Sequence, residues 1–595
     1  MKSTTRLYAK RYLLNAIVKE IPLAKQNKRV HIWLPFILLF FGFFFLEFRL
    51  YCLQILDYEK FSKEAQESQD RIVEILPKRG IIYDRNLEKL AINVPAYSFY
   101  AHPKEISHPE KVAEQLSSIL EVETADLAER LKKEATFIWL KRKLSFAQKE
   151  VIDDLHLKGI DFIEETERFY PQKELACHLL GFTGVDNQGL AGVELYYDKD
   201  LRGEKGRFWL KRDGLGYEIS STKESLQDLV PGKEIVLTID NIIQSIVEQE
   251  ISLALEERKA KSVEAVFMDP RTGEILALAN KPDYDPNCYS SYSSFSRKDR
   301  IVQSLYEPGS AFKPVTISTL LEEGLVDQEE RIYCGESVKV ANHIIHDWRS
   351  FNQNFTLAEI IKNSSNVGVV KLAGRMKKEV FSKYIRLFGF GEKTGLDLPG
   401  EERGIVRSPS SWSLTDLPCI AMGQGIAVTP LQMVTALSAL INGGELLRPY
   451  LVKYVRSPEG KIVEKNGSVV RGRVISSSVS SQMRELLGQV VEQGTGGRAK
   501  VEGYSIGGKT GTAQIPAPDR RGYLSDKYIS SFMGFASVDS PVIAGIVVIK
   551  EPTGAYYGGE IAAPLFGKIM KRVLPYLNIL PQKEEWVERK IVDFS

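Results

Sequence analysis

Cysteine is scarce in this chain of 595 residues: there are five, far apart in the sequence, and no C-x-x-C pair. This spacing argues against a zinc cluster and against a disulfide framework, and it leaves one long-range disulfide open. Net charge is also nearly absent, because 79 basic residues face 77 acidic ones and the sum is +2. The composition therefore gives no reason to expect nucleic acid as a partner.

Long apolar runs are missing except near the N-terminus. Residues 32–46 carry no charge, and a helix continued to Leu56 has 25 residues, a length of about 37 Å, which crosses a bilayer core with some tilt. Eight basic residues and one acidic residue precede this segment. The pattern predicts an uncleaved membrane anchor over 32–56, with 1–31 in the cytoplasm and the rest of the chain outside.

Two ionisable residues, Glu47 and Arg49, lie within this anchor. One interpretation is that both side chains extend to the outer interface of the membrane. The other is a polar contact with a second membrane protein, because ionisable groups at such depth are often functional. The residues themselves leave both interpretations open.

The rest of the chain divides by its texture into two regions and a tail. Residues 57–225 alternate short β-like runs with helical stretches and show no catalytic constellation. The polar, turn-rich stretch 219–234 predicts a linker. From 226 to 580 the pattern gives strands at both ends and helices between them, which predicts an α/β domain with one mixed sheet covered by helices. Residues 581–595 form a short charged tail.

The pattern S-x-x-K occurs twice. Ser220 and Lys223 lie in the polar stretch, so we interpret that copy as chance. Ser310 and Lys313 follow a Pro-Gly turn, and Pro314 is tolerated only in a first helical turn, so a helix begins near Ser310. A lysine one turn later is within reach of the hydroxyl and serves as its base if its pKa is lowered. A lone motif of this kind is more often a helix start with a solvated lysine.

Two further patterns are also duplicated. Ser350-Phe-Asn352 is loop-like, and Lys393-Thr-Gly runs into Pro and Gly. The other copies lie in regular elements: Ser364-Ser-Asn366 at a helix junction and Lys509-Thr510-Gly511 on a predicted strand. The ordered set of Ser310-x-x-Lys313, Ser364-x-Asn366 and Lys509-Thr-Gly is specific, because all three follow residue 226 in suitable elements.

These motifs resemble those of penicillin-binding proteins and serine β-lactamases, and the whole chain resembles a class B penicillin-binding protein, a transpeptidase of peptidoglycan synthesis. KRGIIYDRNLEKLAINVPAYSFYAHP (78–103) and LLGFTGVDNQGLAGVELYYDKDLRGEKG (179–206) are similar to the family's N-terminal boxes, and GQGIAVTPLQM and VVEQGTGGRA to later segments. The Ser-Ser-Asn motif resembles that of the division-specific FtsI type, and Arg49 resembles an Arg in the membrane helix of that type. The resemblance implies a mixed α/β transpeptidase domain, with an antiparallel sheet covered by helices, on an α+β pedestal of the dimerisation type.

Carried over residue by residue, the resemblance implies a mechanism. Ser310 attacks the penultimate D-Ala carbonyl of a stem peptide, with Lys313 as base. Ser364 passes the proton to the leaving amine, and Asn366 positions the substrate amide. Lys509, Thr510 and Thr512 hold the terminal carboxylate, and Gly511 allows close backbone approach. The backbone N–H groups of Ser310 and Thr512 form the oxyanion hole.

The resemblance also implies partners. Peptidoglycan stem peptides act as donor and as amine acceptor, β-lactams act as covalent inhibitors, and a SEDS-family, FtsW-like membrane polymerase is expected beside other division proteins. It implies no metal and no organic cofactor, and a location in the bacterial inner membrane with a periplasmic catalytic domain.

Three other functions compete with this prediction. An elongation-type relative shares most of the motifs. A β-lactamase needs a base for deacylation, and no E-x-x-L-N follows Asn366. A β-lactam sensor needs an internal signalling domain, for which 31 residues are too few.

Overall fold

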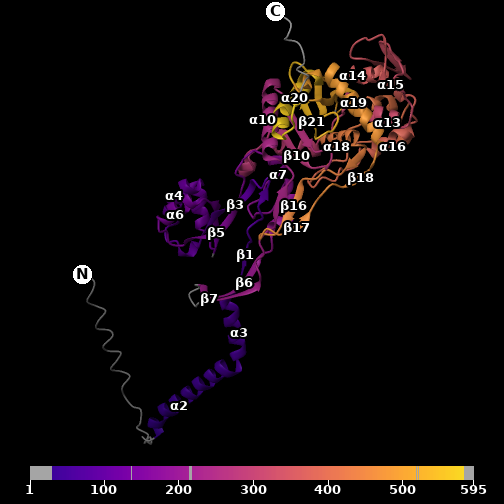
Figure 1. Cartoon of the computed structure of the whole chain (residues 1–595). Coiled ribbons are helices and arrows are strands. Elements are labelled where there is room, and N and C mark those ends of the chain that lie inside the picture. Colours follow the sequence, from indigo (N-terminus) through magenta and orange to yellow (C-terminus); the bar gives the residue numbers. More distant parts are fainter. Residues whose placement is uncertain (1–29, 136, 213–217, 518, 520–521, 582–595) are drawn as a thin grey trace, which may run out of the picture. The chain divides into compact units, whose positions relative to one another are not determined.

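The computed structural model describes residues 30–135, 137–212, 218–517, 519 and 522–581. Its internal contacts divide the chain into two compact units (Figure 1). Unit 1 contains residues 1–75 and 207–227, and unit 2 contains 76–206 and 228–595. The predicted cytoplasmic segment, up to residue 29, and nearly all of the predicted tail lie outside the described residues.

Unit 1 is built from the predicted anchor and a small sheet. The helix α2 (Val30–Tyr51) continues through a π-helical turn (Cys52–Leu56) and is followed by α3 (Tyr58–Gln69). The strands are β1 (Asp70–Ile75), β6 (Gly206–Arg212) and β7 (Glu218–Gln227), in the order β1-β6-β7.

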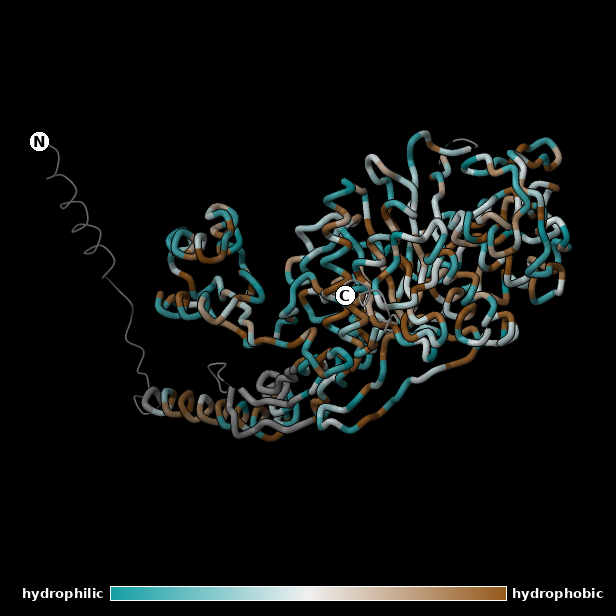
Figure 2. The backbone as a smooth tube through the Cα atoms, turned by 45° about the horizontal axis from the view of Figure 1, so that its top comes forward, coloured by the Kyte–Doolittle hydropathy of each residue, from teal (hydrophilic) through white to brown (hydrophobic). Residues whose placement is uncertain are grey.

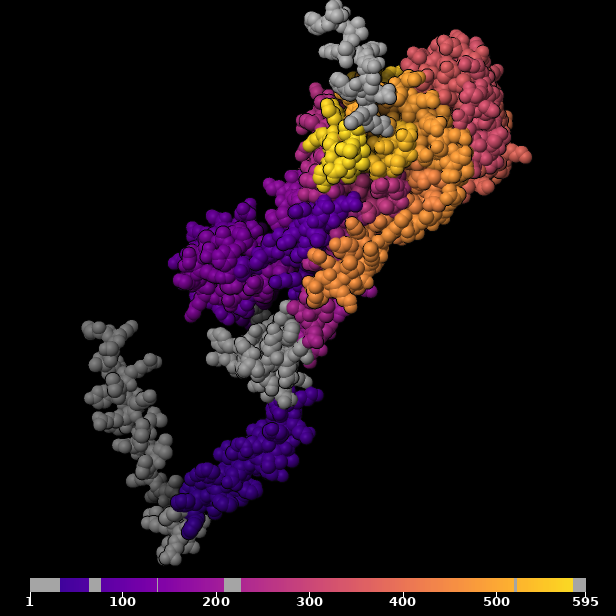
Figure 3. Space-filling model, in the orientation of Figure 1, coloured from indigo at the N-terminus to yellow at the C-terminus, as the bar shows by residue number. Residues whose placement is uncertain are grey.

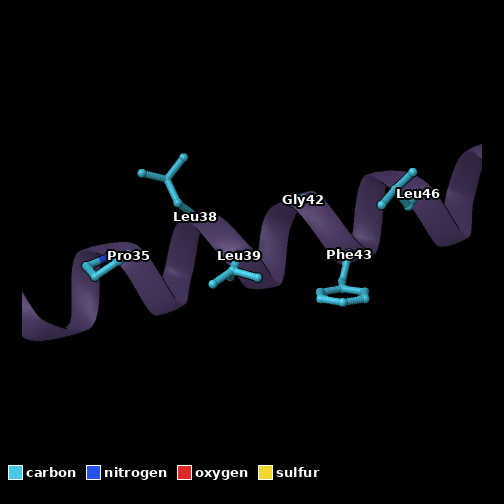
Figure 4. Close-up of a pocket in the computed structure, with 6 residues that line it drawn as sticks. All are labelled: Pro35, Leu38, Leu39, Gly42, Phe43 and Leu46. Atoms are coloured by element: carbon cyan, nitrogen blue, oxygen red, sulfur yellow. The ribbon is translucent and has the colours of Figure 1, made fainter.

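The helix α2 is mostly apolar, with Glu47 and Arg49 near its C-terminal end. Residues 33–56 are long and apolar enough to cross a membrane, and Figure 2 shows hydrophobic residues along most of α2. Gly42 leaves a shallow apolar hollow of about 450 Å³ beside Leu38, Phe43 and Leu46 (Figure 4). Exposing such a helix to water has a large free-energy cost, so this helix fits a single-pass membrane anchor.

The linker predicted over 219–234 is wrong. Most of this stretch is the strand β7, which pairs antiparallel with β6, and the next strand, β8 (Glu234–Leu237), begins at its end. The copy of S-x-x-K at Ser220 and Lys223 therefore lies on a strand of unit 1.

Unit 2 contains two large sheets. The first is a five-stranded antiparallel sheet in the order β10-β9-β21-β20-β19. Its strands are β9 (Ser262–Met268), β10 (Ile275–Lys281), β19 (Ile506–Pro516), β20 (Tyr523–Ala536) and β21 (Ile543–Lys550). Strands from both ends of the region thus form one antiparallel sheet, and β19 is at its edge.

Both faces of this sheet are covered by helices, as the sequence predicts. Alternate residues of β9, such as Val263 and Phe267, pack with α10 (Asn241–Arg258) and α20 (Gly558–Tyr576). The residues between them, such as Val266, join the larger core with α13 (Lys313–Glu322), α18 (Pro430–Ile441) and α19 (Ser477–Gln493). A strand buried on both faces is apolar without alternation, which explains the run SVEAVFM.

The second sheet joins distant parts of the chain. Its order is β17-β16-β8-β2-β3-β4, and β5 also pairs with β3. The strands are β2 (Ile82–Tyr83), β3 (Lys89–Ala101), β4 (Ile138–Leu144), β5 (Ile160–Phe169), β16 (Val452–Arg456) and β17 (Ile462–Lys465). The pairing of β16 with β8 brings residues near 450 to the N-terminal region of unit 2.

The remaining elements are short. The helices and 3₁₀ turns are η2 (Pro103–Glu105), α4 (Pro109–Leu120), α5 (Thr124–Leu131), α6 (Phe146–Asp153), α7 (Cys177–Leu180), α8 (Gly192–Tyr196), α9 (Asp198–Arg202), η3 (Pro286–Ser291), α11 (Ser294–Arg297), α12 (Arg300–Gln303), η4 (Gly309–Phe312), α14 (Leu357–Lys362), α15 (Asn366–Ala373), α16 (Lys378–Leu387), η5 (Pro409–Ser411), α17 (Asp416–Ala421) and η6 (Gly497–Ala499). Three two-stranded sheets are formed by β11 (Ile332–Cys334) with β14 (Gln353–Phe355), β12 (Ser337–Val340) with β13 (His343–His346), and β15 (Glu445–Leu447) with β18 (Val470–Arg473). The space-filling view shows the residues from β11 to α16 gathered at one end of unit 2 (Figure 3).

A buried ion network joins the two N-terminal boxes. Glu194, with 0% exposure, accepts from Arg79 Nε at 2.6 Å and from Arg168 Nε at 2.5 Å. Both guanidinium groups also donate to backbone carbonyls, Arg79 to Glu194 O and Arg168 to Gly80 O. The carboxylate is thus the shared partner of two buried cations.

Replacing Glu194 with Ala leaves both guanidinium groups buried beside an empty position. We expect the free energy of unfolding to fall by about 3–5 kcal/mol, measured by urea denaturation of the full chain in detergent. The matched control is Glu445→Ala, which breaks the exposed pair with Arg473 and should cost no more than about 1 kcal/mol. Equal losses in the two variants would contradict a structural role for the network.

Candidate functional site

Ser310 lies in the turn η4, at the start of a buried helix. Gly309 has a φ of +53° and donates its N–H to Gly423 O at 3.0 Å. A Cβ at Gly309 would be 2.9 Å from Thr512 O, so this position requires glycine. The turn continues into α13, with Pro314 in its first helical turn as predicted. Lys313 is the first residue of α13 and is fully buried.

Ser364 lies at the junction between α14 and α15. Its φ is +56°, a left-handed conformation that is costly for a residue with a Cβ. The next residue, Ser365, caps α15 by accepting from Gly368 N at 2.9 Å. Asn366 then begins α15. The unusual backbone at Ser364 directs its carbonyl and its hydroxyl toward one partner, Lys313.

Lys509 lies on β19, the edge strand of the five-stranded sheet, and is fully buried. Two residues later, a Cβ at Gly511 would be 2.3 Å from Ser531 Oγ and 2.9 Å from Pro308 O. Gly511 therefore allows β19 to lie directly against the turn that carries Ser310.

One serine hydroxyl joins the three motifs. Lys509 Nζ donates to Ser364 Oγ at 2.9 Å, and Lys313 Nζ lies 3.4 Å from the same oxygen. Lys313 also donates to Ser364 O at 2.7 Å and to Asn366 Oδ1 at 2.8 Å. A neutral amine has two N–H donors, and these two short bonds use both of them. The nitrogen lone pair then stays available to take a proton.

Burial favours the neutral form of both lysines. Desolvation lowers the pKa of Lys313 to about 7, and the negative charge of Asp347 opposes this shift. Desolvation also lowers the pKa of Lys509 well below its ordinary value, and the nearby Lys313 lowers it further. At neutral pH the site thus contains an amine that acts as a base, which an exposed lysine does not provide.

Residues of all three motifs line a cavity of about 1140 Å³. Ser310, Ser364, Asn366, Thr510 and Thr512 all line it. The second copies of the motifs lie elsewhere. Thr394 of the other K-T-G donates to the buried Glu401. In the other S-x-N, the Asn352 amide donates to Ser350 Oγ in an exposed stretch.

Thr510 and Thr512 present hydroxyl groups with different partners. Thr510 Oγ1 accepts from Lys509 Nζ and lies 3.2 Å from Thr495 Oγ1. Thr512 Oγ1 accepts from Gly558 N at 2.9 Å, at the start of α20. Since a hydroxyl that accepts still has its own proton to donate, Thr512 remains available to a bound anion.

Asp347 is a site residue that sequence reasoning missed. It follows the β12–β13 hairpin, accepts from Ser365 Oγ at 2.7 Å and Val367 N at 3.1 Å, and also bonds the N–H of Asn366. Its carboxylate therefore holds the N-terminus of α15, where the helix dipole favours a negative charge. No local motif marks it, because it stands seventeen residues before Ser364 in an irregular stretch. Thr495 was also missed, although it lies in the family-like segment VVEQGTGGRA.

Within the described residues, no group of three or more His, Cys, Asp or Glu could hold a metal ion. The five cysteines all lie in the described part of the chain and carry free thiols, so the long-range disulfide left open by the sequence is not formed.

Replacing Asp347 with Asn removes the charge that raises the pKa of Lys313. We expect the titration midpoint of Lys313 to fall below about 7, followed by NMR of ε-¹³C-labelled lysine and assigned by the signal missing in Lys313→Met. Asp416→Asn is the control, because Asp416 also lines the cavity but pairs with Arg407. An unchanged or higher midpoint in Asp347→Asn would refute this electrostatic effect.

Two family models match this chain. The model of the penicillin-binding protein transpeptidase domain matches residues 263–571, and that of the penicillin-binding protein dimerisation domain matches 74–237. Solved structures agree with both. Penicillin-binding protein 3 from Mycobacterium tuberculosis, complexed with aztreonam, has a TM-score of 0.69 at 28% identity, covering 86% of this chain and 98% of that one. A peptidoglycan synthetase from Bifidobacterium adolescentis has a TM-score of 0.70 at 27% identity, covering 87% and 98%.

Curated relatives match over nearly the full length. Stage V sporulation protein D from Bacillus subtilis is 37% identical over 575 residues, covering 95% of this chain and 88% of the relative. Peptidoglycan D,D-transpeptidase FtsI from Escherichia coli is 34% identical over 546 residues, covering 90% of each chain. The predicted resemblance is confirmed, and the chain belongs to the class B penicillin-binding proteins, with a dimerisation domain, a transpeptidase domain and the D,D-transpeptidase activity of the family.

Proposed function

We propose that this protein cross-links peptidoglycan stem peptides through an acyl-enzyme on Ser310. The proposal depends on the position of Ser364 Oγ, which lies between the amines of two buried lysines. Ser364 and Ser310 line the same cavity. A serine hydroxyl needs a base at neutral pH, and Lys313, three residues after Ser310, has a suitably lowered pKa.

In the proposed acylation, neutral Lys313 takes the proton of Ser310 as Oγ attacks the penultimate D-Ala carbonyl. Backbone N–H groups of Ser310 and Thr512 stabilise the oxyanion. Ser364, bonded to both lysines, passes a proton to the departing D-Ala amine, and Asn366 positions the substrate amide. Lys509, Thr510 and Thr512 hold the terminal carboxylate, which Gly511 lets approach the strand. A bound carboxylate raises the pKa of Lys509 again, so Lys509 becomes an ammonium ion beside the substrate carboxylate.

The same chemistry makes the site a target of β-lactams, which carry a carboxylate beside a reactive carbonyl. The Mycobacterium tuberculosis relative, solved with aztreonam, supports this proposal. The proposed domains are a cytoplasmic segment (1–31), a membrane helix (32–56), a pedestal (57–225), a transpeptidase domain (226–580) and a tail (581–595). They place the catalytic part outside the inner membrane, in agreement with the basic residues before the helix.

Ser310→Ala tests the nucleophile directly. The full-length protein in detergent, incubated with penicillin, should gain the mass of one drug molecule and keep it for many minutes, and Ser310→Ala should gain none. Ser350→Ala, in the other S-x-N pattern, is the matched control and should be acylated like the wild type. Rapid loss of the adduct with catalytic drug consumption would indicate a β-lactamase. A folded wild type without any adduct would exclude acyl transfer at Ser310.

The cellular process is a separate proposal. The FtsI relative and the Ser-Ser-Asn motif favour septal synthesis during cell division, with a SEDS-family, FtsW-like polymerase as partner near Glu47 and Arg49 of α2. The sporulation relative is more similar in sequence, at 37% against 34% identity, and favours a rival role in sporulation. An elongation-type role is the third possibility.

Localisation in growing cells separates these roles. If the protein acts in division, a fluorescent fusion should collect at midcell in every cycle, and its depletion should give filaments. Accumulation only in sporulating cells would support the sporulation role, and a signal along the side wall with rounded cells would support elongation. A fusion with Arg49→Ala should lose midcell enrichment if the membrane helix contacts a division partner.

A further inference from the structure

Glu307 presents a carboxylate to the cavity that contains Ser310, three residues before the serine. Its Oε1 accepts from Gly425 N at 2.9 Å, and its Oε2 accepts from Tyr523 OH at 2.9 Å. Tyr523 lines the same cavity from the first residue of β20. The side chain is therefore fixed from both sides in one orientation.

This carboxylate is partly buried and unmatched in charge. Burial raises the pKa of Glu307, while the bonds from Gly425 and Tyr523 lower it. The cations near the cavity have other partners. Lys313 and Lys509 bond Ser364, and Arg407 pairs with Asp416. Arg498, which lines the cavity, donates to Glu560 O at 3.4 Å. Among the ion pairs between described residues, none includes Glu307. Buried charges are usually paired, so an unmatched carboxylate facing a cavity indicates a cationic ligand.

The second half of the reaction requires such a ligand. The acyl-enzyme is attacked by a primary amine, and an alkyl amine with a pKa near that of lysine, about 10, is almost wholly an ammonium ion at neutral pH. The groups assigned to the donor are the hydroxyls near Lys509, whose partners are Thr495 and Gly558. Glu307, Gly425 and Tyr523 form a separate polar group with no hydrogen bond to those residues in the described structure.

We propose that Glu307, held by Tyr523 and Gly425, binds the ammonium group of the acceptor and orients it toward the acyl-enzyme on Ser310. This proposal rests on the proposed acyl transfer and concerns the acceptor half of the same site.

The ammonium group gives one proton to the Glu307 carboxylate and becomes a neutral amine. Its nitrogen forms a bond to the acyl carbon, and the bond from that carbon to Ser310 Oγ breaks. The second proton of the nitrogen passes to Ser310 Oγ, and Glu307 releases its proton to solvent. The products are an amide and the free serine.

The experiment compares aminolysis with hydrolysis in the full-length protein. The donor is an N-acyl-D-alanyl thioester, and the acceptor probe is Nα-acetyl-L-lysine at pH 7.5. Glu307→Gln keeps the size of the side chain but removes its charge. We expect the ratio of amide product to hydrolysed product to fall about tenfold or more, as for loss of one charge-assisted hydrogen bond. Tyr523→Phe should give a smaller fall, because Gly425 still holds the carboxylate.

Three controls make the result specific. Hydroxylamine is uncharged at this pH, so its reaction with the acyl-enzyme should fall much less in Glu307→Gln. Penicillin acylation uses no acceptor, so its rate should change by less than about twofold. Glu560→Gln, which removes another carboxylate from the cavity lining, should leave the product ratio unchanged.

The outcomes separate the two proposals. A wild type without a penicillin adduct refutes the acyl transfer itself. Normal acylation with an unchanged product ratio in Glu307→Gln refutes only the acceptor site. Equal losses with lysine derivative, hydroxylamine and penicillin also refute it, because Glu307 would then support the nucleophile rather than the acceptor.

Discussion

The structure depends on the burial of two lysine amines around one serine hydroxyl. Lys313 and Lys509 are both fully buried, and placing two like charges together without water is costly. The protein meets this cost by giving each amine short acceptors, three of them from Ser364 and Asn366. The left-handed backbone of Ser364 is part of the same arrangement, because it turns both the carbonyl and the hydroxyl of one residue into the site.

Glycines without a Cβ allow three parts of the chain to meet closely at the site. Side chains at Gly309 and Gly511 would collide with Thr512 O and Pro308 O respectively. A Cβ at Gly423 would be 2.1 Å from Gly309 O. Three glycines thus let an edge strand, a 3₁₀ turn and a loop meet at backbone contact distance. The double-sided core beneath β19 makes this contact rigid, since helices pack on both faces of the sheet.

The sequence predicted those features of the fold that depend on the local pattern of residues. The pattern predicted strands at both ends of the region 226–580 and helices between them, and Pro314 located the start of α13. The copy of S-x-x-K at Ser220 was set aside because of its polar surroundings, although it lies on the strand β7. The linker prediction for 219–234 failed because β7 is a polar strand that pairs with β6, and the composition of such a strand resembles that of a linker. Pairing of β16 with β8, Asp347 with α15, and Tyr523 with Glu307 joins residues from about 20 to more than 200 positions apart. Such contacts leave no periodic signal in one sequence.

The two lysines are not equivalent, and their difference suggests an order of events. Asp347 raises the pKa of Lys313, whereas Lys313 lowers that of Lys509. On the proposed roles, a terminal carboxylate beside Lys509 raises the pKa of Lys509, because an opposite charge favours the ammonium form. Repulsion from the new cation then keeps Lys313 neutral. Substrate binding would therefore favour the neutral form of Lys313, in which it acts as the base for Ser310, and the hydroxyl of Ser364 lies between the two amines.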